Sequence, residues 1–375
     1  MRTVRALLYR DLVWSIFFVS VAFLSLFFFI DFLDQLEGVG RHGMTMWHAV
    51  LAALLVVPAR LYELSPISVL IGAIYAMARL AQSSEFTILR TGGLGPGRAL
   101  GLLAGLGVLL AGLTFITGEY MAPWGEQQAL AMKARLRGGQ SFGVAGAWLK
   151  ERRETPDGTH AISINVERTG ADGLMQHIRI FEHDAKGRLL SRTEAATGHA
   201  MAALAGSVWQ LQDVSQTLWP KADGADSSDT AVQTRHLATL DWATTLDERL
   251  VAAAVSPIDS MSTTELWRYS RHLTDQEQTA QRYQLLFWKR ALYPFACIVM
   301  MALALPFAYL QARSGGVSIK VFGGIMLGIS FVLLNNVVGH LGLLRDWTPW
   351  MAASVPSLLY LALSMAAFAW LVRFR

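Results

Sequence analysis

The chain has 375 residues, of which 53% are hydrophobic and only 16% are charged. Soluble domains carry roughly a quarter charged residues, and more than half of the charged residues here lie between residues 123 and 282. This composition excludes a single soluble enzyme domain and a disordered chain. It indicates a water-soluble segment inserted into a membrane protein. The only cysteine is Cys297, which excludes an intramolecular disulfide.

Five apolar stretches are long enough to cross a bilayer, whose hydrocarbon core of roughly 30 Å needs about 20 helical residues. They cover residues 12–30, 99–118, 291–312, 321–344 and 347–372. Between them we expect one further span, from about residue 60 to residue 80, because Pro58 and Pro66 interrupt the helical hydrogen bonds. The apolar run at residues 42–59 is then expected to form a separate helix that lies along the membrane surface.

The positions of Lys and Arg predict the orientation of the six spans. Six spans place the basic residues of the chain ends and of two connecting loops on the same side, as the positive-inside rule requires of the cytoplasm. These residues are Arg2, Arg5, Arg10, Arg79, Arg90, Arg98, Arg313, Lys320, Arg373 and Arg375. The sequence therefore predicts that both termini lie in the cytoplasm and that the soluble segment lies outside, between the third and fourth spans.

The outer segment shows strand periodicity. Apolar and polar residues alternate over residues 160–169, 174–183, 188–196, 199–205, 207–219 and 233–242, with Gly- and Asp-rich turns between them. This pattern favours an all-β domain of the sandwich or jelly-roll type. Ser262 and Glu265 have capping-box spacing and predict a helix that runs toward Arg271.

These patterns divide the chain into three parts. Residues 1–122 hold spans one to three, residues 123–275 hold the β domain with flanking helical connectors, and residues 276–375 hold spans four to six. The balance of acidic and basic residues in the outer domain argues against a nucleic-acid partner.

The sequence lacks the motifs of common enzyme classes. It contains no G-x-x-x-x-G-K-[ST] phosphate loop, no H-E-x-x-H zinc motif and no G-x-S-x-G nucleophile elbow. We therefore expect no catalytic residue, no cofactor, no metal site and no ATP hydrolysis by this chain itself.

Residues 82–93 form the most informative cytoplasmic connection. Ser84 and Glu85 precede the apolar Phe86, and Arg90 with a Gly- and Pro-rich run follows. An ordinary loop is one reading. A short amphipathic helix that docks a cytoplasmic partner is the reading we prefer, because apolar groups are rarely left exposed in a short loop.

A few polar and glycine positions inside the spans also carry predictions. Arg60 and Glu63 are three residues apart and can pair, either as a structural pair or as a substrate contact. Asn335, Asn336 and His340 either join helices or line a cavity. The pairs Gly101 with Gly105 and Gly324 with Gly328 predict close helix packing.

A cluster of basic residues follows the third span. Lys133 and Arg137 are four residues apart and would share a helix face, where they could meet lipid phosphates. A solvated run of charges is the alternative.

Several motifs resemble one membrane-protein family over essentially the whole chain. The matching residues are Pro58, Tyr62, Glu63, Pro66, Leu70, Gly72, Leu80 to Glu85 and Arg90 around the second span; Gly118, Glu119, Tyr120, Ala122, Pro123, Gly125 and Glu126 after the third; and Gln281, Tyr283, Trp288, Lys289, Arg290 and Pro294 at the fourth. Together they resemble the lipopolysaccharide-export permease family, LptF/LptG. The exit of the first span, Asp34-Gln35-Leu36, is more similar to the LptG branch of the family.

The resemblance implies a function and partners. It implies a non-hydrolysing permease of an ABC-type transporter in the inner membrane of Gram-negative bacteria, paired with a second LptF-like permease over an LptB-like cytoplasmic ATPase dimer. Lipopolysaccharide would enter between span one of one permease and span five of the other and pass through jelly-roll domains to LptC-like and LptA-like periplasmic proteins. The coupling residues would be Ser84, Glu85, Phe86 and Arg90.

The same resemblance implies substrate-binding residues. Apolar contacts would come from Phe23, Phe27 and Ile30 of span one and from Leu333 and Val337 of span five. The outer end of span one departs from the family pattern, because it carries Asp31, Asp34 and Glu37 before its first cation, Arg41. Asp34 and Arg41 would border the site, and either Lys133 and Arg137 or the partner permease would supply more of the phosphate contacts.

A second function stays open at this point. A membrane-anchored envelope scaffold could use the β domain to recruit a periplasmic partner without transporting lipid. The amphipathic segment near Glu85 argues against the scaffold, which needs no ATPase dock. A lipid-modifying enzyme lacks a nucleophile and base.

Overall fold

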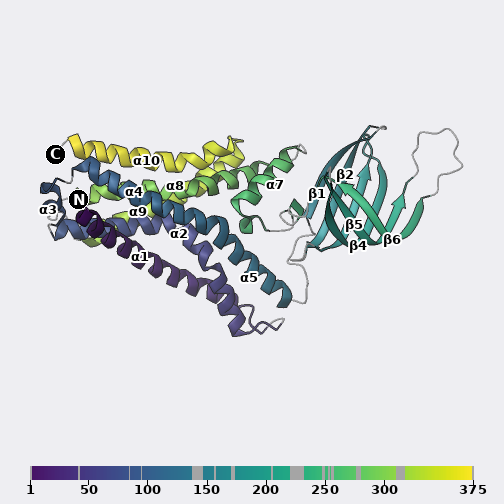
Figure 1. Cartoon of the computed structure of the whole chain (residues 1–375), viewed down its shortest axis with the longest axis horizontal. Coiled ribbons are helices and arrows are strands. Elements are labelled where there is room, and N and C mark those ends of the chain that lie inside the picture. Colours follow the sequence, from purple (N-terminus) through teal and green to yellow (C-terminus); the bar gives the residue numbers. More distant parts are fainter. Residues whose placement is uncertain are drawn as a thin grey trace. The chain divides into compact units, whose positions relative to one another are not determined.

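The protein divides into a helical unit and a mainly β unit, seen here in a computed structural model (Figure 1). The helical unit comprises Met1–Arg137 and Gln281–Arg375, and the β unit comprises Gly138–Ala280. The structure describes residues 2–40, 43–83, 85–93, 95–136, 147–155, 158–169, 174–203, 206–219, 232–246, 250–251, 254, 257–275, 280–309 and 317–373.

The helical unit confirms six spans. Six of the described helices are long and apolar enough to cross a membrane, three on each side of the β unit in the sequence. Its elements are α1 (Arg2–Leu36), α2 (Met46–Gln82), α3 (Glu85–Thr91), α4 (Pro96–Ile116), the π-helical turn η1 (Thr117–Met121), α5 (Ala122–Leu136), α8 (Gln281–Tyr309), α9 (Val317–Leu344) and α10 (Pro349–Arg373). Because α4, η1 and α5 follow one another without a break, they form the third span together.

The expected break before the second span is wrong. α2 runs without interruption from Met46 to Gln82, with Pro58 and Pro66 inside it. Proline removes one backbone donor, and in a membrane helix neighbouring groups can satisfy the carbonyl that this leaves free. The carbonyl that Pro66 leaves free is that of Tyr62, and next to it the Ser65 hydroxyl donates to the Leu61 carbonyl at 2.6 Å. The apolar run at residues 42–59 is therefore no separate helix but contributes the first part of a long α2.

α2 is the central helix of this unit, and glycines let its neighbours approach. A Cβ at Gly72 of α2 would lie 2.6 Å from the Ile16 Cα of α1. Cβ atoms at Gly324 and Gly328 of α9 would lie 2.6 Å and 3.0 Å from Ile74 and Ile67 of α2. The packing predicted for the Gly324 and Gly328 pair is therefore confirmed.

The other glycine pair is only half confirmed. A Cβ at Gly105 of α4 would lie 3.3 Å from the Tyr9 hydroxyl, whereas a Cβ at Gly101 would meet no atom within 4 Å. Gly105 therefore faces α1, where Tyr9 also donates to the Leu102 carbonyl at 2.8 Å. Among the described residues of this chain, the close packing predicted for Gly101 is not present.

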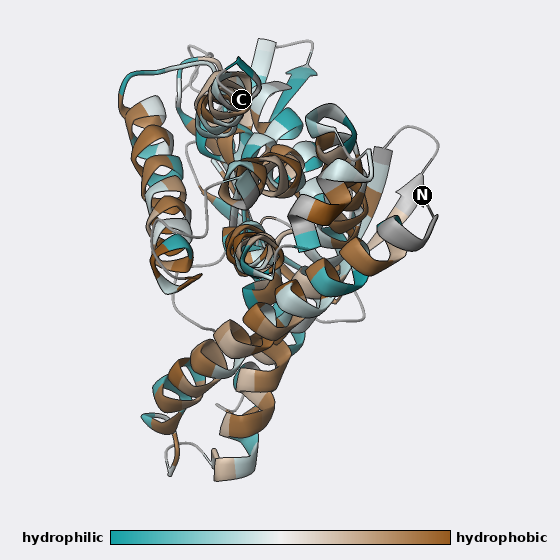
Figure 2. Cartoon of the chain, turned by 90° about the vertical axis from the view of Figure 1, so that its left-hand side faces the viewer, coloured by the Kyte–Doolittle hydropathy of each residue, from teal (hydrophilic) through white to brown (hydrophobic). Residues whose placement is uncertain are grey.

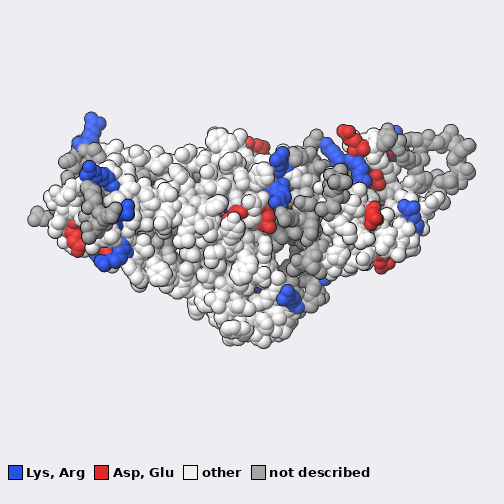
Figure 3. All heavy atoms as spheres, in the orientation of Figure 1, with Lys and Arg blue, Asp and Glu red and all other residues white. Residues whose placement is uncertain are grey.

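The surface of the helical unit is apolar along the helices and charged at its ends. Figure 2 shows α1 crossing the bundle obliquely with hydrophobic residues along most of its length. Figure 3 shows Lys and Arg gathered at the end where α3 and the N terminus lie, beside a broad surface without charge. This is the distribution on which the orientation was predicted, and the orientation itself stays a prediction.

The β unit is a six-stranded antiparallel sheet in which each strand pairs with the next one in sequence. Its strands are β1 (Ala147–Thr155), β2 (Gly158–Thr169), β3 (Met175–His183), β4 (Leu189–Ala203), β5 (Gly206–Leu218) and β6 (Gln233–Thr244). The prediction of an inserted all-β domain is confirmed. β1 had not been predicted as a strand, because its Lys-Glu-Arg-Arg-Glu run hides the alternation.

Two expected strands on either side of Gly198 form the single strand β4. A Cβ at Gly198 would lie 2.7 Å from Ile178 Cδ1 and 2.8 Å from Leu211 Cδ2. The glycine therefore does not mark a turn. It makes room for apolar side chains of the two neighbouring strands on the same face of the sheet.

The β unit ends in a capped helix. α7 (Thr263–Asp275) follows the short 3-10 turn η2 (Ile258–Ser260). The Ser262 amide donates to Glu265 Oε2 at 2.7 Å, and the Glu265 amide donates to Ser262 Oγ at 3.2 Å. Both halves of the predicted capping box are therefore present.

Candidate functional site: exposed membrane faces and a polar joint

The predicted substrate residues lie on two helices that stay largely exposed. Ile30 of α1 is 43% exposed, and Leu333 and Val337 of α9 are 59% and 53% exposed. Phe23 and Phe27 are half-buried, and Asp34 is exposed. α1 and α9 both pack on α2 and not closely on each other, so within one chain the described residues do not form one pocket from both predicted sets.

The apolar face of α1 is larger than the sequence-based set of residues. Large side chains that were not selected are among its most exposed, namely Trp14, Phe17, Phe18, Val21, Leu26, Phe29 and Leu33. An apolar helix has no polar stripe to show which side is buried. The sequence therefore signalled a span but could not say which of its phenylalanines face outward.

A polar joint connects α1 to α2 near the end of α1. Arg60 donates from Nε and Nη2 to the two carboxylate oxygens of Asp31 at 2.9 Å and 2.7 Å, and from Nη1 to Glu63 at 2.9 Å. The pairing of Arg60 with Glu63 was predicted, whereas Asp31 was missed as a partner because it is 29 residues away in sequence. The Arg60 guanidinium also lies 5.7 Å from the centroid of the Phe27 ring, so Phe27 packs on this joint.

Family-motif residues meet beside the joint. The Tyr62 and Tyr293 rings lie 4.9 Å apart, and the Tyr293 hydroxyl donates to the Glu63 carbonyl. A Cβ at Gly118, in the π-helical turn, would lie 2.4 Å from the Tyr62 ring. A Cβ at Gly125 would lie 2.1 Å from the Leu55 carbonyl oxygen. The motif glycines therefore allow the third span to lie against α2.

The predicted cytoplasmic segment contains a short helix. α3 covers Glu85–Thr91, with Glu85 exposed in its first turn and Ile88 67% exposed. Leu89 packs against the core. Arg79, which precedes α3 near the end of α2, forms an ion pair of 2.8 Å with Asp11 of α1. Ser84 lies outside the described residues, as do the side chains of Phe86 and Arg90. The helix is as expected, and its docking role stays a prediction.

The predicted phosphate contacts are only partly visible. Lys133 is half-buried in the last turn of α5 and interacts with a neighbouring group. Arg137 and Arg41 lie outside the described residues, so the expected pairing of Lys133 with Arg137 on one helix face stays a prediction. In the part of the chain that the structure describes, no group of three His, Cys, Asp or Glu residues could hold a metal ion.

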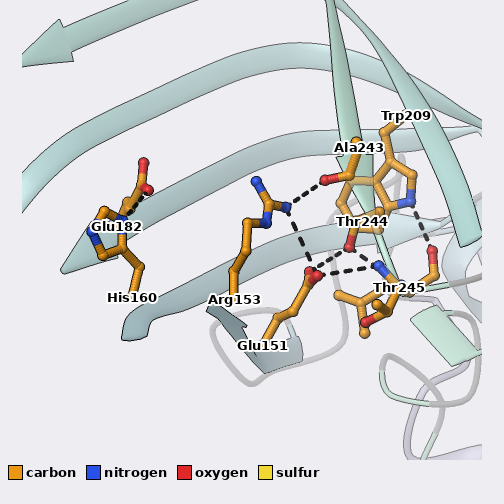
Figure 4. Close-up of polar contacts among 9 residues, drawn as sticks. Glu151, Arg153, His160, Glu182, Trp209, Ala243, Thr244 and Thr245 are labelled. Carbon is orange, nitrogen blue, oxygen red and sulfur yellow. Dashed lines mark hydrogen bonds and ion pairs between the residues drawn. The ribbon is translucent and has the colours of Figure 1, made fainter. Parts of the chain in front are cut away.

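Side chains of β1 reach the opposite edge of the sheet at β6 (Figure 4). The buried Glu151 accepts from Thr244 Oγ1 at 2.6 Å and from the Thr245 amide at 3.2 Å. Arg153 donates to the Ala243 carbonyl at 2.5 Å and stacks over the Trp242 ring at 5.3 Å. Because β1 and β6 are the two outer strands, these contacts show that the sheet curls until its edges meet at this point.

A second polar group lies on the same face of β2 and β3. His160 Nδ1 lies 2.8 Å from Glu182 Oε1, and Ser191 Oγ donates to Glu182 Oε2 at 3.1 Å. Glu182 stands between the histidine and the serine, so the histidine cannot act as a base toward that hydroxyl. These contacts stabilise the sheet and do not form a nucleophilic site.

Six long apolar helices, three before and three after an antiparallel β unit in the sequence, indicate a multi-pass membrane protein. Residues 6–372 match the family "Lipopolysaccharide export system permease LptF/LptG", and the chain belongs to this family. It is 30% identical to the lipopolysaccharide export system permease protein LptG of Escherichia coli K12 over 90% of this chain and 89% of that protein. It is 27% identical to the protein of the same name from Haemophilus influenzae over 94% of both chains.

Proposed function

We propose that the chain is one of two permease subunits of an ATP-driven transporter that extracts lipopolysaccharide from the inner membrane. Membership of the export permease family supports this. The structural observation that supports it is that α1 and α9, like α4 and α10, expose large apolar side chains outside the core of a single chain. A second, LptF-like permease would cover part of these faces, and the acyl chains of the lipid would lie between them.

The remaining parts of the chain would serve the transport cycle. α3 would dock an LptB-like ATPase dimer in the cytoplasm, through Glu85 and its neighbours. The β unit would lie in the periplasm, where LptC-like and LptA-like proteins would carry the lipid onward. Lys133 and Arg137 would contact lipid phosphates above the apolar residues Phe23, Phe27, Ile30, Leu333 and Val337.

The docking role of α3 predicts the effect of one charge reversal. Glu85→Lys places a cation in the first turn of α3, where it opposes the positive end of the helix and alters the exposed docking surface. We expect association with the ATPase subunit, and ATP turnover of the assembled complex, to fall at least fivefold while the chain still inserts and unfolds at its usual temperature. Co-purification and ATP turnover measured with and without the ATPase test this.

Glu154→Lys is the matched control, because it makes the same change at an exposed position of β1. It should leave association and turnover unchanged. Normal association of the Glu85→Lys variant would refute the docking role. A chain that binds envelope partners but neither an ATPase nor lipopolysaccharide would instead be a scaffold.

A further inference from the structure

The helical unit holds one lysine in an unusual position between two spans. Lys289 of α8 extends to α9, where its ammonium donates to the Asn335 carbonyl at 3.1 Å. A Cβ at Gly339 would lie 2.3 Å from Lys289 Nζ and 2.7 Å from its Cε. Any other residue at position 339 would therefore displace the lysine, so Gly339 forms a notch that receives this side chain.

The charge of Lys289 lacks a counter-charge among the described residues. Its one hydrogen bond is to a backbone carbonyl, and no described carboxylate lies within the 4.0 Å of an ion pair. Arg60, the cation of the polar joint in the same unit, has two carboxylate partners, at 2.7 Å and 2.9 Å. An ammonium has three donors, and an isolated cation within a membrane span is costly unless it has a function or a partner.

The depth of Lys289 indicates which anion could reach it. α8 has 29 residues, about 43 Å at a rise of about 1.5 Å per residue, which matches a hydrocarbon core of about 30 Å with its headgroup layers. Lys289 is the ninth residue from the end joined to the β unit, so its Cα lies about 6 Å inside the hydrocarbon edge. An extended lysine side chain spans a similar distance. Its ammonium can therefore reach the hydrocarbon edge, next to the lipid headgroups.

The adjoining surface of α9 becomes polar at the same level. Asn336 and His340 are exposed there, and His340 Nδ1 lies 2.8 Å from the Asn336 carbonyl oxygen. Below them the exposed residues of α9 include the large apolar side chains Ile329 and Leu333. A bound lipid would therefore meet apolar side chains along its acyl chains and polar groups at its head.

We propose that the surface where α8 meets α9 is a lipid-phosphate site, in which Lys289, held in the Gly339 notch, binds the phosphate of a membrane lipid. Asn336 and His340 border the headgroup. The site goes beyond the proposed transport function and does not depend on it, because a phospholipid and a phosphorylated glycolipid offer the same phosphate chemistry. Lys289 binds and orients the headgroup and takes part in no reaction.

Native mass spectrometry of the full-length chain tests this site with two probes. Phosphatidylglycerol and lipid A are titrated separately against the parent and the Lys289→Met, Lys289→Arg and Gly339→Ala variants. We expect Lys289→Met to weaken binding of at least one probe fivefold or more, and Lys289→Arg to retain most of it. Gly339→Ala keeps the charge but fills the notch, so it should also weaken binding.

Lys150→Met is the control for non-specific attraction, because Lys150 is an exposed lysine of β1. Loss confined to lipid A would assign the site to a phosphorylated glycolipid, and loss with both probes would assign it to membrane phosphates in general. Binding of both probes by Lys289→Met at the level of the parent would overturn the proposal, as would an equal loss in Lys150→Met. The unfolding temperature of each variant shows whether it is folded. If Lys289→Met fails to fold, Lys289→Gln, which also removes the charge, is compared with the parent for binding of the same two probes.

Discussion

At the scale of single residues, the polar joint shows what a sequence can and cannot reveal. Arg60 and Glu63 are neighbours on one helix turn, so their spacing predicted the contact. Asp31 belongs to another helix, and its side chain, which pairs with Arg60, is only 9% exposed. The acidic end of the first span therefore departs from the expected basic pattern for a local reason. One of its carboxylates, that of Asp31, pairs with Arg60 of the same chain.

Removal of Arg60 alone should lower the free energy of unfolding more than removal of both Arg60 and the Asp31 charge. Arg60→Met leaves the buried Asp31 charge without a partner, which costs on the order of 3 kcal/mol. Arg60→Met combined with Asp31→Asn removes both charges and should cost clearly less. Thermal unfolding of the purified variants in one detergent measures this difference. A single variant as stable as the double variant would contradict the buried-pair interpretation.

The turn between β3 and β4 predicts a pH dependence. Asp184 accepts from the Arg188 amide at 2.8 Å and the Lys186 amide at 2.9 Å, and Arg188 Nε donates to it at 2.7 Å. These contacts, first among them the bond from the Arg188 backbone, lower the pKa of the Asp184 carboxyl. A lowered folded-state pKa stabilises the fold above the usual Asp pKa of about 3.9, and the effect is lost as the pH falls through the folded-state value.

Asp184→Asn should therefore unfold at a lower temperature than the parent at neutral pH. The two curves should converge as the solution is acidified below the ordinary Asp pKa. Parallel melting curves across that pH range would show that the charge of Asp184 does not stabilise the turn.

At the scale of the elements, length and hydropathy predicted the spans better than proline did. Pro58 and Pro66 suggested a break, yet α2 continues through both, because packed neighbours maintain the helix. Gly198 suggested a turn, yet it lies within β4 under Ile178 and Leu211. In both places the local signal was real, and tertiary packing determined the structure. The close approach at Gly125 is another packing effect that no local pattern predicts: a Cβ there would lie 2.1 Å from the Leu55 carbonyl oxygen.

Gly125→Ala tests the close approach of α5 to α2. The new Cβ would collide with the Leu55 carbonyl. Because a helix backbone cannot move independently, the two helices must separate, which should lower the free energy of unfolding by about 2 kcal/mol or more. Gly112→Ala in α4 is the control, since a Cβ there meets no atom within 4 Å. That control should be neutral or slightly stabilising, by about 0.5–1 kcal/mol. Equal unfolding temperatures for the two variants would contradict the close approach.

At the scale of the whole molecule, charge and hydropathy predicted two sets of three spans around a β insertion. They could not predict that the sheet curls until Glu151 and Arg153 of β1 contact the end of β6, because those contacts join residues about ninety positions apart. They also could not show that α1 and α9 leave apolar faces uncovered. In the proposed function, a second permease and a lipid would cover these apolar residues of α1 and α9.

The most direct test of this account is photocrosslinking from the exposed face of α9. A photoreactive phenylalanine at Leu333, which is 59% exposed, is compared with one at Leu103, which is 1% exposed in the core. Both are expressed with the second permease and the ATPase in cells that make lipopolysaccharide. We predict that ultraviolet light links lipopolysaccharide to position 333 and not to position 103. An assembled complex in which position 333 captures no lipopolysaccharide, or captures no more than position 103, would contradict the proposed transport role.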